Sequence, residues 1–277
     1  ILPLDAAGLC RDYYPDTVYA VDNLLEVIRI LDGQSDSSGL LVKNRSYGSG
    51  TAQESGVEVD FSQIVGQEFA KRGMEIAAAG GHNLLMIGPP GSGKSSLAKA
   101  LAGILPPMTP EESLETSKIY SVAGLYRTPG TMLHRPFRSP HYSASIPAII
   151  GGGSDSILPG EISLAHNGVL FLDEFCEAPK RVIEALRGPM EDRQVTISRL
   201  KTKVTYPASF MLAAAANPCP CGYYGEGNRC RCTPGQRAGY IARLSGPMMD
   251  RIDIQLWMHA VDGLKLINPP RAESSAA

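Results

Sequence analysis

Leu84-Leu85-Met86-Ile87-Gly88-Pro89-Pro90-Gly91-Ser92-Gly93-Lys94-Ser95 joins a short apolar run to a glycine-rich turn. The apolar run predicts a buried strand, and residues 96–102, which follow, predict a helix. Residues 88–95 match G-x-x-x-x-G-K-[ST] at every fixed position, in the strand–loop–helix context that this pattern requires. A chance glycine turn before a helix is the alternative, but it leaves the flanking strand and helix unexplained. We therefore predict a binding site for a nucleoside triphosphate.

Each residue type in this loop has a chemical reason. Gly91 and Gly93 let backbone N–H groups curl around an anion with no Cβ in the way, and the helix N-terminus adds partial positive charge. Lys94 supplies a cation for the β- and γ-phosphates, and the Ser95 hydroxyl is a ligand for Mg²⁺. The residues of this loop that we expect to hold ATP with its Mg²⁺ are Gly88, Pro89, Pro90, Gly91, Ser92, Gly93, Lys94, Ser95 and Ser96.

Two further apolar runs end in polar residues. Residues 168–172 lead into Asp173 and Glu174, and residues 210–216 lead into Asn217. We expect Asp173 to complete the Mg²⁺ shell opposite the loop serine, and Glu174 to position or deprotonate the attacking water. Asn217 is a candidate for a hydrogen bond to that water or to the γ-phosphate. The plainer alternatives are two solvated acids at a strand end and an asparagine in a turn.

The overall composition is that of an ordinary globular protein. The chain has 277 residues, 43% hydrophobic and 19% charged, enough for one large domain or two modest ones. The formal net charge of −2 gives no global basic surface, so any contact with nucleic acid must be local. No apolar run reaches the roughly 18 residues of a membrane span, and no charged-then-apolar leader is present. We therefore expect a cytoplasmic protein.

The chain divides into four expected parts. Residues 1–34 contain one amphipathic helix, with Asp22 or Asn23 as N-cap and Gly33 just past its end. Residues 35–56 are rich in serine and glycine and predict a linker. Residues 57–260 form the main domain, and residues 261–277 begin a further element.

Apolar runs alternate with helical patterns in the main domain. Continuous apolar strands of this kind predict a parallel sheet covered on both faces, an α/β fold. Capping boxes begin helices at Thr109 and Thr233, and period-two alternation predicts a hairpin that turns near residues 200–201. The remaining expected elements are helices at 68–79, 96–102 and 180–186 and strands at 84–87, 168–172, 210–216 and 252–257.

Four segments together resemble AAA+ ATPases: residues 88–95, 172–174, 216–222 and 244–253. The resemblance is closest to the magnesium-chelatase-like branch of the ComM/YifB competence type, and it covers residues 57–257 nearly continuously. It implies a P-loop αβα sandwich that forms a ring, a hexamer, with ATP bound between subunits. It also implies that residues 1–34 are the tail of an upstream Lon-protease-like domain. The helical lid that normally follows is largely missing from 261–277, so no lid arginine can be assigned.

The resemblance assigns three more site residues. It implies that Arg251 reaches the neighbouring subunit's γ-phosphate as an arginine finger, an element worth roughly 10³-fold or more in turnover. The alternative is an internal salt bridge with Asp250 or Asp253. The resemblance also implies that Ile64 and Val65 contact adenine, and the alternative is that they belong to the core.

Four of the six cysteines are bunched, as Cys219, Cys221, Cys230 and Cys232. Four thiolates are the ligand set of a structural Zn²⁺ site, although the C-x-C spacing is tighter than the usual C-x₂-C. Free or redox-labile thiols are the second interpretation, and disulfides, which a reducing cytosol disfavours, are the third. We expect Cys10 and Cys176 to have no part in this cluster.

No acidic residue lies between Glu115 and Asp155. This mostly loop stretch combines cations with aromatic rings, the two ingredients of sequence-tolerant nucleic-acid binding; they are Lys118, Arg127, Arg135, Arg138, His134, His141, Tyr120, Tyr126, Phe137 and Tyr142. The hairpin adds Arg199, Lys201 and Lys203, and in the resembling family such insertions face a central pore and track DNA. A solvated loop face is the alternative.

These observations favour an ATP-hydrolysing AAA+ motor that acts on DNA, in helicase or branch-migration work. One alternative is an ATPase subunit that drives metal insertion into a porphyrin. The other is a regulatory module that binds nucleotide without hydrolysing it.

Overall fold

The computed structural model describes residues 1–7, 14, 16–33, 37–44, 59–125, 132–153, 156–199, 203–261 and 273–275. The chain separates into two compact units, residues 1–55 with 108–134 and residues 56–107 with 135–277. The expected domain limits at 34, 56 and 260 stay predictions. Residues 200–201, Cys10, Tyr126 and Arg127 lie outside the described part.

The first unit is built of short elements around a small apolar cluster of Ala7, Ala20 and Val42. Part of the expected linker belongs to this cluster, because the Val42 amide donates to the Val18 carbonyl at 2.8 Å. The expected helix is present, with the Asn23 side chain as its N-cap. The elements are β1 (Leu2–Pro3), α1 (Leu4–Ala7), β2 (Ala20–Val21), α2 (Leu24–Asp32), 3₁₀ turns at Ser37–Leu40 and Val42–Asn44, and α5 (Pro110–Val122), which begins at the expected Thr109 capping box.

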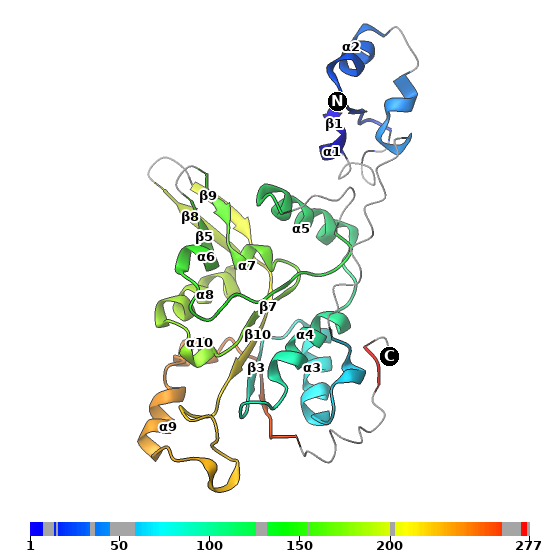
Figure 1. The fold of residues 1–277 in the computed structure, drawn as a ribbon. Helices are drawn as coiled ribbons and strands as arrows, with labels where there is room; N and C mark the ends of the chain where they lie inside the picture. Colours follow the sequence, from blue (N-terminus) through cyan, green and yellow to red (C-terminus); the bar gives the residue numbers. More distant parts are fainter. Residues whose placement is uncertain are drawn as a thin grey trace. The chain divides into compact units, whose positions relative to one another are not determined.

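A five-stranded parallel sheet forms the centre of the second unit and confirms the α/β prediction (Figure 1). Its strand order is β11-β3-β10-β7-β4, and each neighbouring pair is parallel. The strands are β3 (Leu84–Ile87), β4 (Phe137–Arg138), β7 (Val169–Leu172), β10 (Met211–Ala216) and β11 (Ile254–Trp257). Parallel neighbours require crossover connections, and helices supply most of them here.

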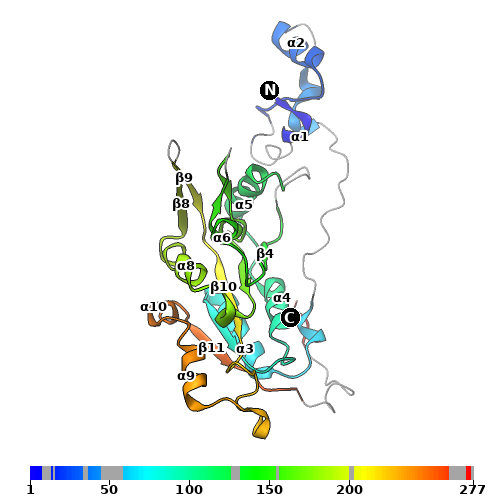
Figure 2. The same cartoon turned by 60° about the vertical axis from the view of Figure 1, so that its left-hand side comes forward.

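Helices cover both faces of this sheet (Figures 1 and 2). Successive strand residues point to opposite faces, so Leu84 and Met86 pack with α3 (Glu68–Gly80) and α4 (Lys94–Ile104), whereas Leu85 and Ile87 pack with α8 (Lys180–Asp192). Both apolar layers are closed to solvent, as the buried strand patterns require. Shorter helices on the α8 side are α6 (Ile146–Ile150), α7 (Glu161–Leu164) and α10 (Gly246–Met249).

The structure confirms two further predicted elements and departs from the prediction at α8 and in the acid-free stretch. The expected hairpin is present as β8 (Gln194–Ser198) paired antiparallel with β9 (Lys203–Pro207), and α9 (Pro234–Ile241) begins at its expected capping box. Helix α8 continues past residue 186 to Asp192, because Pro189 and Met190 are buried and stabilise the last turn. The stretch expected to be mostly loop contributes the edge strand β4 and, at Gly151–Gly152, strand β5, which pairs with β6 (Leu158–Pro159).

Of the expected start of a lid, the structure describes residues 261 and 273–275. The Ser275 hydroxyl accepts from the Phe61 amide at 2.9 Å, and the Ser275 amide donates to Asp60 at 3.0 Å. These bonds place residue 275 against the 3₁₀ turn Phe61–Gln63 that precedes α3. Within the described residues, no helix has both the length and the apolar character needed to cross a bilayer.

Candidate functional site

The ends of three adjacent strands bring the expected site residues together. β10 lies between β3 and β7, with Ala216 in register with Ile87 and Ala214 in register with Leu172. Because all three strands are parallel, their carboxyl ends lie at one edge of the sheet, where open α/β sheets bind ligands. The phosphate loop, the two acids and Asn217 follow directly after these strands.

The loop after β3 has the backbone expected of an anion cradle. Gly91 and Gly93 have φ values of +78° and +89°, which side chains with a Cβ rarely adopt. Gly88 is needed for a different reason, because a Cβ there would lie 2.8 Å from the Met258 carbonyl oxygen. α4 then begins at Lys94, so its first N–H groups face the loop.

Lys94 lies largely buried under this loop, with 8% of its surface exposed. Its Nζ donates to the carbonyl oxygens of Gly88 at 2.7 Å and Pro89 at 2.9 Å, and lies 3.5 Å from Asn217 Oδ1. Burial lowers the pKa of Lys94, and the Asp173 carboxylate opposes that shift. An anion bound in the cradle would add to the stabilisation of the charged amine.

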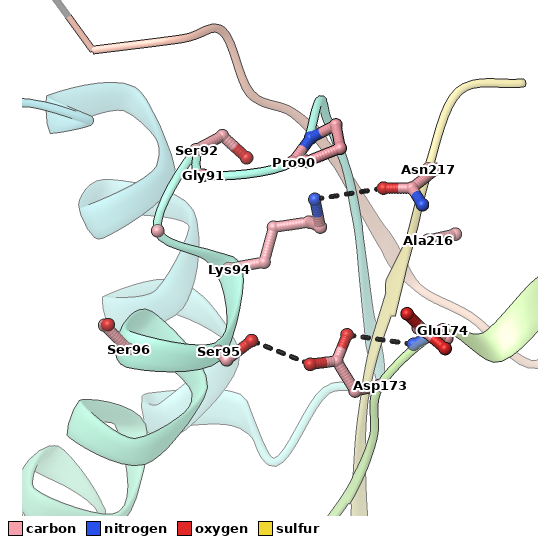
Figure 3. A pocket seen from close by; sticks show the side chains of 11 residues that line it. Pro90, Gly91, Ser92, Lys94, Ser95, Ser96, Asp173, Glu174, Ala216 and Asn217 are labelled. Atoms are coloured by element: carbon pink, nitrogen blue, oxygen red, sulfur yellow. Dashed lines mark hydrogen bonds between the residues drawn. The ribbon is translucent and has the colours of Figure 1, made fainter. Parts of the chain in front are cut away.

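Ser95 and Asp173 form a pair of oxygen ligands suited to Mg²⁺. Ser95 Oγ donates to Asp173 Oδ2 at 2.7 Å, and the other carboxylate oxygen accepts from the Glu174 amide at 2.9 Å (Figure 3). Hydroxyl and carboxylate oxygens are the donors that a hard divalent cation prefers. Glu174 has a left-handed backbone, with φ of +50°, which is uncommon for a residue with a side chain and recurs at functional sites.

A cavity of about 430 Å³ joins these groups. That volume lies within the range of roughly 300–1,000 Å³ found for small-molecule sites. Figure 3 shows Lys94, Asp173, Glu174 and Asn217 facing the same space from the loop and from the two neighbouring strand ends. The lining residues are Pro90, Gly91, Ser92, Gly93, Lys94, Ser95, Ser96, Asp173, Glu174, Ala216 and Asn217.

The expected adenine contacts lie outside this lining. Ile64 is buried in the α3–α4 core layer and Val65 is partly buried, so their contact with adenine stays a prediction. The next residues of the same segment contain a contact that the sequence did not reveal. Gln67 Nε2 donates to the Ser92 carbonyl at 3.0 Å and to the His259 carbonyl at 2.7 Å. Gln67 thereby ties the phosphate loop to the segment after β11.

Arg251 is paired within its own subunit in this structure. Its guanidinium donates to Glu191 at the end of α8 and to the Pro247 carbonyl of α10. The side chain is 18% exposed. The partner is neither Asp250 nor Asp253; the Asp253 carboxylate instead accepts from the Asn83 amide at 2.8 Å. To act as an arginine finger, Arg251 must therefore first leave Glu191.

The four bunched cysteines converge, with sulfur atoms all within 4.8 Å of one another. Cys219 Sγ lies 3.4 Å from Cys221 Sγ and 3.8 Å from Cys230 Sγ, and the latter two are 3.7 Å apart. All four thiols are free in the structure, since a disulfide requires sulfur atoms about 2.05 Å apart. Backbone N–H groups of Tyr223 and Arg231 lower the pKa of the Cys221 thiol to about 6, whereas burial and the neighbouring thiols raise the pKa of Cys230 and raise the pKa of Cys232 to about 11. Cys176 is buried elsewhere, in the α8 core layer.

Two cations of the acid-free stretch form hydrogen bonds and an ion pair within the protein. Arg138 forms a two-pronged pair with Glu161, at 2.6 and 2.8 Å, and Arg135 donates to the carbonyls of Pro106, Pro107 and Asn167. Phe137 stacks on Phe171, with ring centroids 6.0 Å apart. These three side chains support the sheet edge. Exposed cations in the described part of the predicted DNA-contacting set are Lys118, Arg199 and Lys203.

Comparison with known proteins identifies the family. The family model described as magnesium chelatase, subunit ChlI, matches residues 60–266. The chain is 49% identical over 238 residues to the uncharacterized protein YifB of Salmonella typhimurium, covering 86% of this chain and 45% of that protein. It is 44% identical over 260 residues to the competence protein ComM of Haemophilus influenzae, covering 93% of this chain and 50% of that protein.

A more distant relative is the magnesium-chelatase 67 kDa subunit of Chlorobaculum parvum, 27% identical over 166 residues, covering 58% of this chain and 23% of that subunit. The chain thus spans about half the length, or less, of the curated relatives it matches. The family match extends over the whole sheet and all three site-bearing strand ends. The chain therefore belongs to the magnesium chelatase ChlI-subunit family of AAA+ proteins, in the branch that contains YifB and ComM.

Proposed function

We propose that this chain is the ATP-hydrolysing core of a AAA+ ring motor that remodels DNA. One observation carries the ATPase part: the 2.7 Å bond between Ser95 and Asp173, made beside the amine of Lys94. It joins a loop hydroxyl and a strand-end carboxylate in the arrangement that Mg²⁺ and a nucleoside triphosphate require.

The chain's own residues have distinct roles in the proposed hydrolysis. Loop N–H groups and Lys94 bind the phosphates and stabilise charge that develops on them. Glu174 holds the attacking water in line with the γ-phosphate and accepts its proton, while the Asn217 amide hydrogen-bonds the water or the γ-phosphate. Ser95 and Asp173 would hold Mg²⁺, which neutralises charge on the phosphate oxygens when it is bound.

Assembly into a ring would give Arg251 a role in ATP hydrolysis. Subunits of AAA+ proteins commonly form rings, and we propose a hexamer in which Arg251 of one subunit completes the site of the next. Glu191 supports this proposal because its side chain is 60% exposed although that of Arg251 is only 18% exposed, so water can solvate the Glu191 carboxylate once Arg251 turns to a phosphate.

DNA is the proposed substrate of the motor. The hairpin supports this, because β8 alternates exposed with buried residues, β9 is exposed or partly buried throughout, and Arg199 and Lys203 are both exposed to solvent. Figures 1 and 2 show the hairpin at the opposite end of the second unit from α9. One relative is named a competence protein, which also favours work on DNA.

We further propose Zn²⁺ as the ion of the cysteine cluster and the cytoplasm as the site of action. A tetrahedron of sulfur atoms around Zn²⁺, with Zn–S of about 2.3 Å, has edges of about 3.8 Å. The separations of 3.4, 3.7 and 3.8 Å among Cys219, Cys221 and Cys230 are close to that value.

ATP turnover by the full-length protein, with and without branched or single-stranded DNA, tests the proposal. We expect turnover that DNA stimulates and DNA binding that weakens as salt rises. Turnover without any DNA binding would contradict the DNA part. The relative named as a magnesium-chelatase subunit then makes porphyrin metal insertion the next candidate. Nucleotide-dependent assembly without turnover would instead indicate a regulatory module.

A further inference from the structure

We infer that the cysteine cluster positions Asn217 and Pro90 for ATP hydrolysis, so that the metal in the cluster is a structural part of the nucleotide site. This inference rests on the proposed ATPase function. It assigns the metal a role beyond holding a surface loop together.

The cluster begins two residues after Asn217. β10 ends at Ala216, Asn217 lines the cavity, and Cys219 follows with no exposed surface. Little backbone therefore separates a proposed metal ligand from the amide that faces the γ-phosphate position. A displacement of Cys219 would be transmitted to Asn217 through a single intervening residue, a proline.

The same loop also touches the phosphate loop. Gly222 has φ of +84°, and its amide donates to the Cys219 carbonyl at 2.9 Å. A Cβ at Gly222 would lie 2.9 Å from Pro90 Cδ, 3.0 Å from Pro90 Cγ and 3.9 Å from Asn217 Cγ. Only a glycine lets the loop pack this closely. The turn between Cys221 and Cys230 therefore packs against both Pro90 and Asn217, which line the cavity.

Apart from the cysteine cluster, side-chain contacts hold this turn in its described position, and several of them are exposed. Between Cys221 and Cys230 the secondary structure is a single 3₁₀ turn, Gly227–Arg229. Arg229 lies over the Tyr223 ring at 4.3 Å, a contact within the loop itself. Other contacts leave the turn: Arg237 of α9 lies over the Tyr224 ring at 4.4 Å, and the Glu226 carboxylate accepts from the Ala260 amide at 3.2 Å and lies 3.8 Å from His259 Nδ1. Four metal–sulfur bonds would cross-link the start and the end of the loop, which the weak contacts alone do not secure.

Loss of the metal should therefore lower kcat more than nucleotide affinity. The loop N–H groups around Gly91 and Gly93 and the Lys94 amine remain when the cluster opens, whereas Asn217 and the Pro90 ring lose their support. A misplacement of about 1 Å in a catalytic arrangement can cost on the order of 100-fold, so we expect a fall in kcat of about 10- to 100-fold. A bound nucleotide that contacts Asn217 and Pro90 should in turn hinder the opening of the loop, so we expect the rate of metal release to fall when nucleotide is bound.

Two glycines of the loop provide matched variants of the full-length protein. Gly222→Ala keeps all four thiols but places a methyl group against Pro90. Gly225→Ala makes the same change at φ of +94°, with no atom within 4 Å of the added Cβ. We expect about one zinc per chain by mass spectrometry in both variants. We expect the fall in kcat, with the dissociation constant for ATP within about threefold of wild type, in Gly222→Ala alone.

Cys232→Ser and removal of zinc by a chelator should reproduce the Gly222→Ala loss of kcat, and Cys176→Ala should not. Equal kcat values in the two glycine variants, absence of zinc, or full turnover without zinc would each overturn the inference. Zinc release to a chromogenic chelator, with and without a non-hydrolysable ATP analogue, gives a readout that does not depend on turnover. If the wild type fails to hydrolyse ATP, the proposed function fails. The coupling is then supported if nucleotide slows release in Gly225→Ala but not in Gly222→Ala, and it is overturned if release is equal.

Discussion

Ser95 Oγ and Asp173 Oδ2 lie 2.7 Å apart although 78 residues separate them in the chain. The bond joins the first turn of α4 to the end of β7, across the strand β10 that lies between β3 and β7. A parallel sheet with this strand order brings the two oxygens together. The magnesium site that we propose is therefore a consequence of sheet topology.

Asp173→Asn should weaken the response to Mg²⁺. The amide removes one negative charge and one of the two oxygens that we assign to the cation, so the Mg²⁺ concentration for half-maximal ATP binding should rise by about 10- to 100-fold or more. Calorimetric titration of ATP over a series of Mg²⁺ concentrations measures this. Asp192→Asn, on the exposed end of α8, is the control, and an equal Mg²⁺ response in both variants would contradict the assignment.

Arg251→Ala should greatly lower turnover while each subunit still binds ATP, because we propose that the side chain acts on a neighbour's site. We expect a loss of about 10³-fold. Mixing Arg251→Ala subunits with Lys94→Ala subunits should restore part of the activity, since some interfaces then combine an intact loop with an intact arginine. Glu191→Gln breaks only the pair within the subunit and should keep turnover. No recovery on mixing would place Arg251 in a role within its own subunit.

Arg199→Glu in the hairpin should weaken DNA binding and reduce DNA-stimulated turnover. Loss of a phosphate contact lowers the dependence of binding on salt, by about one in the slope of log K against log salt concentration. Arg72→Glu makes the same change in charge on α3, where Arg72 pairs with Glu75, and should leave both properties close to wild type. Equal losses in the two variants would indicate a general effect of net charge.

Much of this arrangement could be predicted from sequence because its signals are local. The phosphate loop, the polar residues after the apolar runs and the Thr109 and Thr233 caps each depend on a few consecutive residues. Strand β4 was missed because Phe137 and Arg138 form only two residues of strand, in a stretch where proline and glycine suggest loop. The position of β4 depends on partners that are distant in sequence: Phe137 stacks on Phe171, and Arg138 forms an ion pair with Glu161.

The other missed features are also long-range. Nothing near Arg251 in the sequence indicates Glu191 as its partner, and the preceding and following acids suggested a local pair instead. The two hydrogen bonds of Gln67 link positions that are 25 and 192 residues away. Helix α8 was predicted too short because Gly188 and Pro189 are typical of a helix end. The burial of Met190 outweighs that local signal.

The tight packing of the central strand β10 leads to a prediction about the free energy of unfolding. β10 contains four successive alanines, all essentially without exposed surface, between β3 and β7. Ala213→Leu should lower the free energy of unfolding by about 1–3 kcal/mol, because the added atoms overpack the layer under α4. Ala148→Leu on the exposed side of α6 should change it by less than about 0.5 kcal/mol. Urea unfolding measures both, and equal values would contradict the described packing.

The most direct test of the account measures ATP binding and ATP turnover together in Glu174→Gln. The amide keeps the shape of the side chain but does not accept a proton from water. We therefore expect kcat to fall by about 100-fold or more, with the dissociation constant for ATP within about threefold of wild type. Glu177→Gln, in the same turn but paired with Arg243, should behave like wild type. Retention of full turnover by Glu174→Gln would contradict the proposed ATPase site.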